Sequence, residues 1–102
     1  MSFLKKLLGI KSIDYNELMD NGAYIIDVRT PGEFSMGKIK AATNIPLDKI
    51  KSKIKKIEKL KKPVIFCCAS GVRSGQATLI AKARGIDAYN GGGWASLNSK
   101  LN

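Results

Sequence analysis

Histidine is absent from the sequence, which limits the chemistry open to the chain. Histidine is the commonest metal ligand in proteins and the usual general base, so neither role is filled in the usual way. The only two cysteines, Cys67 and Cys68, are neighbours and cannot by themselves make a tetrahedral metal site. We therefore expect no structural metal and no bound cofactor.

The scarcity of cysteine also excludes a disulfide framework. Consecutive residues of a strand point to opposite faces, and a disulfide between neighbours requires a strained peptide. Cys67 is therefore disfavoured as a resolving partner for an oxidised Cys68. A chain without disulfides is typical of a reducing compartment, and we expect a cytoplasmic protein.

Long apolar runs, internal repeats and low-complexity stretches are missing as well. A membrane-spanning helix needs about 20 apolar residues, and the apolar run near the N-terminus is far shorter, so we expect no transmembrane segment. We expect residues 1–12 to form an N-terminal arm that packs on a single domain of residues 13–102. A short amphipathic turn of this arm on a membrane surface is the alternative. The domain is expected to be a monomer.

Acidic residues are few: the sequence holds 8 of them against 18 lysines and arginines, and its net charge is +10. Lysines make up most of this excess and gather between Lys49 and Lys62, a stretch without aromatic residues. Nucleic-acid binders usually combine arginines with aromatic side chains on one face, so we expect no nucleic acid as a partner. We interpret the stretch as a solvated lysine-rich face, with attraction to an anionic partner as the alternative, and the charge favours anionic substrates.

Helix and strand signals alternate along the chain. Capping residues at Asp14 and Thr30 predict two short helices, and apolar residues at every third or fourth position predict a longer helix over Leu47–Leu60. Two more helices are predicted, over Gly75–Arg84 and Trp94–Leu101. Short apolar runs predict strands over Ala23–Val28, Ala42–Pro46, Val64–Cys67 and Ile86–Tyr89, the last of them followed by a glycine turn at 91–93.

Apolar strands separated by helices indicate an α/β fold with a mostly parallel sheet flanked by helices on both faces. Ligands of such sheets bind beyond the carboxyl ends of the strands. The strand over Val64–Cys67 runs directly into Cys68, which precedes a predicted helix. Unpaired N–H groups and the helix dipole there lower a thiol pKa, so Cys68 is predicted to be a nucleophile. Cys67, still within the strand, is interpreted as a buried core residue.

The residues after Cys68 suit a negatively charged ligand. Small residues let the backbone curl around the sulfur and direct several amides at one point, as in an anion-binding nest. Arg73 adds a positive charge and a fork suited to an oxyanion, while Ser74 either caps the helix or donates to a bound anion. The small residues are Ala69, Ser70 and Gly71.

Three separated motifs make the chain resemble the rhodanese (thiosulfate sulfurtransferase) family. Cys68-Ala-Ser-Gly-Val-Arg-Ser74 resembles the family's active-site loop, Cys-x-x-Gly-x-Arg-Ser. Ile26-Asp-Val-Arg-Thr-Pro-Gly-Glu-Phe34, continuing to Asn44-Ile-Pro46, resembles its N-terminal signature. Tyr89-Asn-Gly-Gly-Gly-Trp94 resembles its closing Gly-Gly-x-x-Trp region in a slightly contracted form, so that the resemblance extends from Ile13 to Leu97.

The resemblance implies a five-stranded parallel sheet and a sulfurtransferase that holds sulfane sulfur on Cys68 as a persulfide. The implied donor is a small anion such as thiosulfate or a protein persulfide, and the implied acceptor is a thiophilic molecule or protein. Asp27 and Arg29 would fix the active-site loop by ion pairing rather than take part in catalysis, with Glu33 as a partner for Arg29. The backbone amides implied to cradle the sulfur are those of Ala69, Ser70, Gly71, Val72, Arg73 and Ser74.

Two positions depart from the family pattern. Lys38 stands where the family often has histidine in Gly-His-Ile-x-Gly-Ala. We expect activity to survive this change, because the histidine is not the sulfur carrier. Ala69 stands where many members have arginine directly after the cysteine. Without that cation thiosulfate binding would weaken, and a protein persulfide would become the physiological donor.

Two other interpretations stay open. Counted from Cys67, the spacing to Arg73 is Cys-x5-Arg, the loop length of cell-cycle and tyrosine phosphatases, and arsenate reduction belongs to the same alternative. Counted from Cys68, the loop has the length that goes with sulfur transfer, and Gly71 falls where that pattern requires it. The second alternative is a sulfur carrier without turnover, or a module that binds an anionic or persulfidated partner.

Overall fold

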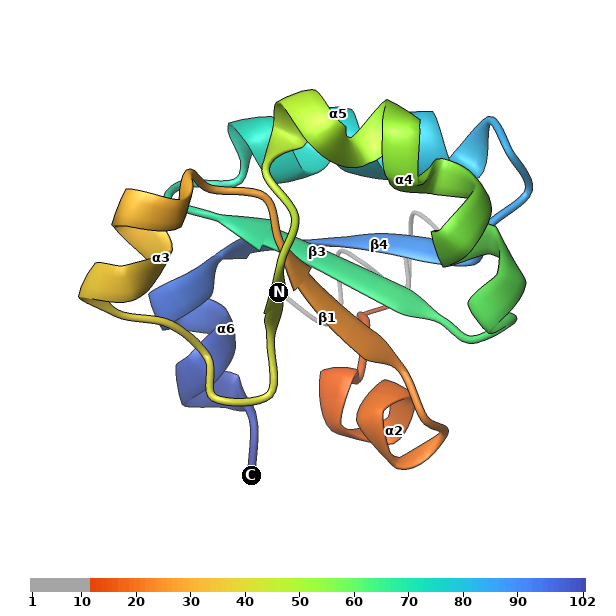
Figure 1. Ribbon diagram of the computed structural model, residues 1–102. Helices are drawn as coiled ribbons and strands as arrows, with labels where there is room; N and C mark the ends of the chain where they lie inside the picture. The colour runs from red at the N-terminus through yellow and green to blue at the C-terminus, as the bar shows by residue number, and fades with distance from the viewer. Residues whose placement is uncertain (1–11) are drawn as a thin grey trace.

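The computed structural model of the chain describes residues 12–102, in which four parallel strands form a central sheet (Figure 1). The strand order is β2-β1-β3-β4, so β1 and β3 lie between two neighbours each. Every pairing is parallel, as the sequence predicted. The strands are β1 (Tyr24–Asp27), β2 (Thr43–Asn44), β3 (Val64–Cys68) and β4 (Ala88–Gly93).

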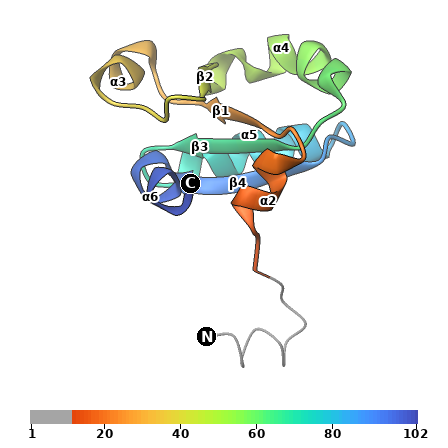
Figure 2. The same ribbon diagram turned by 90° about the horizontal axis from the view of Figure 1, so that it is seen from below.

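Helices cover both faces of the sheet, which confirms the predicted α/β class (Figure 2). α4 and α5 lie on one face, α2 and α6 lie on the other, and α3 follows the carboxyl end of β1 (Figure 1). The helices are α2 (Tyr15–Asp20), α3 (Pro31–Met36), α4 (Leu47–Leu60), α5 (Val72–Lys82) and α6 (Trp94–Lys100).

The sheet has four strands where the family resemblance implied five. One of its edges is β2, which has only two residues and is followed shortly by Pro46, a residue without an N–H group. Such a short edge offers little backbone to a further strand. Before α2 only residues 12–14 are described, and they do not join the sheet. For the described part of the chain, the implied strand count is therefore wrong and the sheet type is right.

α4 forms over the residues that the apolar spacing predicted. Its isoleucines Ile50, Ile54 and Ile57 are buried in the core cluster that includes Phe66 of β3. Burying a side chain of this size contributes about 1.5–3 kcal/mol to folding. The lysines on the other side of α4 are exposed, so the basic stretch forms a solvent-facing surface, as predicted: Lys49, Lys51, Lys53, Lys55, Lys56 and Lys59.

Alternation along β3 separates the two cysteines. Phe66 and Cys68 belong to the core cluster beneath α4 and α5, whereas Ile65 and Cys67 belong to the cluster beneath α2 and α6. Both cysteines are free, as their opposite directions require. Cys67 is fully buried, which confirms its prediction as a core residue.

β4 continues through the glycines that the sequence predicted as a turn. After a register shift in the ladder, Gly92 and Gly93 pair with the end of β3. A Cβ atom on Gly93 would lie 2.9 Å from the carbonyl oxygen of Ala69, so a side chain there would block this approach. The absence of side chains therefore lets β4 run alongside the segment that follows β3, and the prediction of a glycine turn at 91–93 is wrong.

The predicted N-terminal arm, residues 1–12, lies outside the described residues except for Ser12. The structure therefore does not test its packing on the domain or its membrane alternative. Over residues 12–102, no helix is both long enough and apolar enough to cross a bilayer.

Gly91→Ala is expected to lower the free energy of unfolding by about 1–3 kcal/mol, the usual cost of adding volume to a packed site. The new Cβ atom would lie 2.8 Å from Cγ2 of Ile65 and 2.9 Å from Cδ2 of Leu97, both fully buried. Urea unfolding measures the change. Gly32→Ala is the control, since its Cβ atom would meet only Thr30 Oγ1 at 4.0 Å. A Gly91→Ala protein as stable as wild type would contradict this packing.

Candidate active site

Cys68 is the last residue of β3, and the chain turns from it into α5 within a few residues. Gly71 makes the turn possible by adopting a φ of +105°, a left-handed conformation that favours glycine. The helix begins directly after it, so the predicted start at Gly75 is wrong. Ser74 consequently lies inside the first turn of α5 and does not cap the helix, contrary to one of its two predicted roles.

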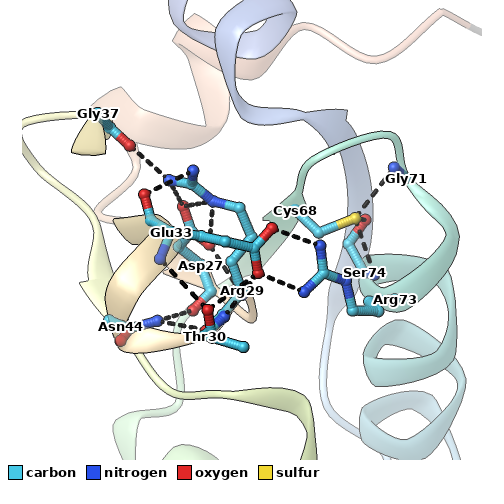
Figure 3. A network of polar contacts seen from close by, with 10 residues as sticks. All are labelled: Asp27, Arg29, Thr30, Glu33, Gly37, Asn44, Cys68, Gly71, Arg73 and Ser74. Atoms are coloured by element: carbon cyan, nitrogen blue, oxygen red, sulfur yellow. Dashed lines mark hydrogen bonds and ion pairs between the residues drawn. The ribbon is translucent and has the colours of Figure 1, made fainter. Parts of the chain in front are cut away.

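Three polar groups surround the sulfur of Cys68 (Figure 3). The Gly71 N–H donates to Sγ at 3.0 Å, the Ser74 N–H donates at 3.4 Å, and the Ser74 hydroxyl lies 3.3 Å away. Burial raises the pKa of the Cys68 thiol, but hydrogen bonds from Ser74, Gly71 and the Ser70 backbone outweigh it and lower that pKa. Because Cys68 is 1% exposed, these donors rather than water stabilise its thiolate.

The other loop residues predicted to bind substrate occupy different positions. The Ser70 backbone helps to lower the pKa of the Cys68 thiol. Ala69 is exposed, and Val72 keeps 70% of its surface exposed, so both border the loop on its solvent side. The groups directed at Cys68 are therefore backbone amides and one hydroxyl, which suit a negative charge on sulfur.

Arg73 is bound to Glu33 of α3 (Figure 3). Its Nη1 and Nη2 atoms donate to the two carboxylate oxygens at 2.7 and 3.0 Å. Arg73, with further hydrogen bonds from Thr30, lowers the pKa of Glu33 to about 2. The prediction that Glu33 pairs with Arg29 is wrong, because Arg29 contacts only the backbone carbonyl of Glu33. The capping box of α3 turns the carboxylate toward Arg73, and the bidentate pair joins α3 to α5.

Asp27 and Arg29 form a buried ion pair at the carboxyl end of β1. Arg29 Nη2 donates to Asp27 Oδ2 at 2.7 Å, and the two side chains are 5% and 0% exposed. Arg29 also donates to the carbonyl of Gly37 at 2.7 Å, and its guanidinium lies 4.8 Å from the ring centroid of Trp94. Hydrogen bonding to Asp27 raises the pKa of Arg29. The pair thus fixes α3 and α6 on β1 and reaches the Cys68 loop only indirectly, through Glu33.

Cys67 lies in a different environment from Cys68. Burial, and after it the charge of Asp27, raises the pKa of the Cys67 thiol to about 12. The Cys-x5-Arg interpretation needs Cys67 as a nucleophile facing the loop, but its side chain lies on the opposite face of the sheet. The hydrogen-bond donors of the loop therefore contact the sulfur of Cys68 and not that of Cys67.

Asn90 is a site residue that sequence analysis missed. Its Nδ2 atom donates to the carbonyl of Gly71 at 3.0 Å, and its Oδ1 atom accepts from the Ser74 hydroxyl at 2.7 Å. It thereby ties β4 to the loop around Cys68. The predicted closing motif contains Asn90, but an asparagine beside glycines is typical of a turn, so nothing in the sequence signalled these contacts.

Within residues 12–102, no three His, Cys, Asp or Glu side chains lie close enough together to bind a metal ion. The polar groups around Cys68 are mostly hydrogen-bond donors. Donors of this kind stabilise anions, so the arrangement is suited to a thiolate, a persulfide or a bound oxyanion.

Arg29→Met is expected to destabilise the protein by about 3–5 kcal/mol, because it leaves the Asp27 carboxylate buried without its counter-ion. Asp27→Asn combined with Arg29→Met removes both charges and is expected to restore a large part of that loss. Denaturant unfolding of both proteins beside wild type provides the comparison. A single variant that unfolds at the wild-type midpoint would show that the pair is not needed for folding.

Comparisons with known proteins place the chain in a family. The model of the Rhodanese-like domain matches residues 13–100. The uncharacterized protein YqhL of Bacillus subtilis is 40% identical over 81 residues, which are 78% of this chain and 64% of YqhL. The chain thus spans less than two thirds of the length of that curated relative.

Solved structures agree with this match. The reduced CoADR-RHD of Bacillus anthracis is 30% identical, with a TM-score of 0.72 over 85% of this chain and 15% of that much longer one. A rhodanese with anions from E. coli is 32% identical, with a TM-score of 0.66 over 72% of this chain and 89% of the other. The human single-domain sulfurtransferase TSTD1 is 27% identical, with a TM-score of 0.61 over 76% and 84%. The chain belongs to the rhodanese-like domain family.

Proposed function

We propose that this protein is a sulfurtransferase that carries sulfane sulfur on Cys68. The observation that carries the proposal is the convergence of the Gly71 and Ser74 donors on Cys68 Sγ at the start of α5. These donors lower the pKa of the thiol, and the thiolate is the form that attacks sulfur. Membership of the rhodanese-like domain family and similarity to a human sulfurtransferase support the same reaction class.

The first half of the reaction loads Cys68. Its thiolate attacks the outer sulfur of a donor, a new S–S bond forms, and the S–S bond of the donor breaks. From thiosulfate the leaving group is sulfite, and from a persulfide it is a thiolate, each departing with the bonding electron pair. Cys68 then carries a persulfide whose negative charge lies on the outer sulfur, and no net proton transfer or external oxidant is required.

The second half passes the outer sulfur to an acceptor. A nucleophilic acceptor, such as cyanide or a thiolate, attacks the outer sulfur of the persulfide. The S–S bond to Cys68 breaks, and Sγ recovers its electron pair as a thiolate. The donors from Gly71 and Ser74 then stabilise Cys68 as the leaving group, and the cycle is complete.

A persulfide is the donor class that the charges around the loop favour over thiosulfate. The guanidinium of Arg73 is already neutralised by the Glu33 carboxylate through two hydrogen bonds. Ala69, the residue directly after the nucleophile, contributes no cation. Little net positive charge is therefore present to attract thiosulfate, which carries two negative charges. A persulfide carries one negative charge and needs less positive charge for binding. The recessed position of Cys68 also requires the donor to present its sulfur end-on.

Phosphatase or arsenate-reductase chemistry through Cys67 is less well supported. Such chemistry needs a thiolate, whereas burial raises the pKa of Cys67 to about 12. A sulfur carrier without turnover needs the same loaded Cys68 as the sulfurtransferase. The discharge step of the experiment below separates the carrier from the enzyme.

Reduced protein incubated with an alkyl persulfide or with thiosulfate is expected to gain one sulfur atom, located on Cys68 by peptide mass spectrometry. Cys67→Ala should load like wild type, whereas Cys68→Ala should not load. The persulfide donor is expected to load several-fold faster than thiosulfate, because Arg73 is paired. Addition of cyanide or a thiol should then remove the sulfur repeatedly under turnover.

Three results would count against the proposal. Sulfur on Cys67 would mean that the wrong nucleophile was assigned. Loading of Cys68 without repeated discharge would identify a carrier instead of an enzyme. An unloaded protein that hydrolyses a phosphatase substrate through Cys67 would replace sulfur transfer by phosphoryl chemistry.

A further inference from the structure

The side-chain amide of Asn90 is held in one orientation by two backbone groups. Its Oδ1 atom accepts from the N–H of Gly92 at 3.0 Å, and its Nδ2 atom donates to the carbonyl of Gly71 at 3.0 Å. Exchanging the oxygen and nitrogen would place donor against donor and acceptor against acceptor. The oxygen of Asn90 therefore faces Ser74, whose hydroxyl lies 2.7 Å away.

This orientation decides where the hydroxyl proton of Ser74 lies. Oδ1 of an amide carries no hydrogen, so Ser74 must donate in the bond to Asn90. A hydroxyl has only one proton, and the 3.3 Å contact between Ser74 Oγ and Cys68 Sγ then has to use the proton of the Cys68 thiol. The result is a chain of two hydrogen bonds, from Cys68 to Ser74 and from Ser74 to Asn90.

The chain cannot persist when Cys68 loses its proton. The thiolate has only lone pairs, so Ser74 can donate to sulfur only by giving up its bond to Asn90. We propose that Asn90 is a positioning residue that competes with the Cys68 thiolate for the Ser74 proton. This inference rests on the proposed function, because the thiolate is the species that would take up sulfur.

The competition has a consequence for sulfur transfer. In the persulfide the negative charge lies on the outer sulfur, and Sγ no longer demands the Ser74 proton, which can return to Asn90. The Ser74–Asn90 bond is thus available to the thiol and persulfide forms, whereas in the free thiolate it competes with a bond from Ser74 to sulfur. Asn90 thereby limits the stabilisation of the thiolate, and the intrinsic nucleophilicity of a thiolate falls as its stabilisation increases.

The other charged and titratable groups near Cys68 are the same whether or not Asn90 or Ser74 is replaced. Arg73 on α5 and Cys67 on β3 act on Cys68 electrostatically, and Arg73 is paired with Glu33 of α3. The residues that β1 and α4 place in the core cluster with Cys68 are apolar. A substitution at Asn90 or Ser74 leaves all of these groups in place.

A double-mutant cycle in a Cys67→Ala background tests the competition without any sulfur donor. The pKa of Cys68 is measured from the ultraviolet absorbance of its thiolate in four proteins: the background, Ser74→Ala, Asn90→Ala and the double variant. Ser74→Ala is expected to raise the pKa of Cys68 both in the background protein and in the Asn90→Ala protein. The rise should be larger by about one pKa unit when Asn90 is replaced, because Ser74 then donates fully to the thiolate.

The sign of the coupling separates competition from simple support. If Asn90 only holds Ser74 in place, Ser74→Ala will raise the pKa less in the Asn90→Ala protein, and the proposal is overturned. Equal rises in both settings also overturn it. Any loosening of the loop by Asn90→Ala is present both with Ser74 and with Ser74→Ala. Its effect on the pKa of Cys68 therefore largely cancels in the cycle.

Asn90→Asp provides a second variant with the opposite expected sign. Its carboxylate loses the bond to the Gly71 carbonyl but accepts from the Ser74 hydroxyl more strongly than an amide does, so the effect of Ser74→Ala should shrink relative to the background. Asn98→Ala, at an exposed position of α6, is the matched control and should leave the effect unchanged. Circular dichroism confirms that each variant is folded. Because no sulfur is transferred, a failed cycle refutes the role of Asn90 and leaves the loading experiment to judge the proposed function.

Discussion

A negative charge on a buried sulfur has to be balanced by hydrogen-bond donors, and the structure around Cys68 is organised by that requirement. The side chain is 1% exposed, so water contributes little to this balance. The first turn of a helix has N–H groups without partners of their own, and the start of α5 supplies them. Gly71 is the residue on which this depends, because its positive φ starts the helix early enough for its own N–H and that of Ser74 to reach Sγ.

Donors are useful only if they stay in place, and contacts from distant parts of the chain hold the loop. Asn90 on β4 binds the carbonyl of Gly71 and the hydroxyl of Ser74. Glu33 on α3 binds Arg73 across 40 positions of sequence. These contacts attach the loop to β4 and to α3. The contact with Glu33 also removes most of the net charge of Arg73. The loop is therefore suited more to stabilising its own sulfur than to capturing a highly charged oxyanion.

The sequence predicted the features that arise from local patterns. The isoleucine spacing of α4 is periodic and β3 is an uninterrupted apolar run, so the fold class, the opposite directions of the two cysteines and the position of Cys68 could be derived from them. The start of α5 could not, because it depends on the φ angle of Gly71. The partner of Glu33 and the role of Asn90 could not either, since both depend on which elements the sheet order brings together. The sequence motif identified the loop, but the contacts that hold the loop in place are tertiary contacts from other parts of the chain.

The claim that the surroundings, and not the residue type, make Cys68 the nucleophile is tested most directly by titrating both cysteines in one sample. Nuclear magnetic resonance of the Cβ atoms follows each thiol separately in the wild-type protein. Cys68 is predicted to ionise below the pKa of an ordinary cysteine, whereas Cys67, with a pKa of about 12, should stay protonated over the same range. If the two cysteines ionise together at the ordinary value, or Cys67 ionises first, the loop does not select Cys68 and the assignment is wrong.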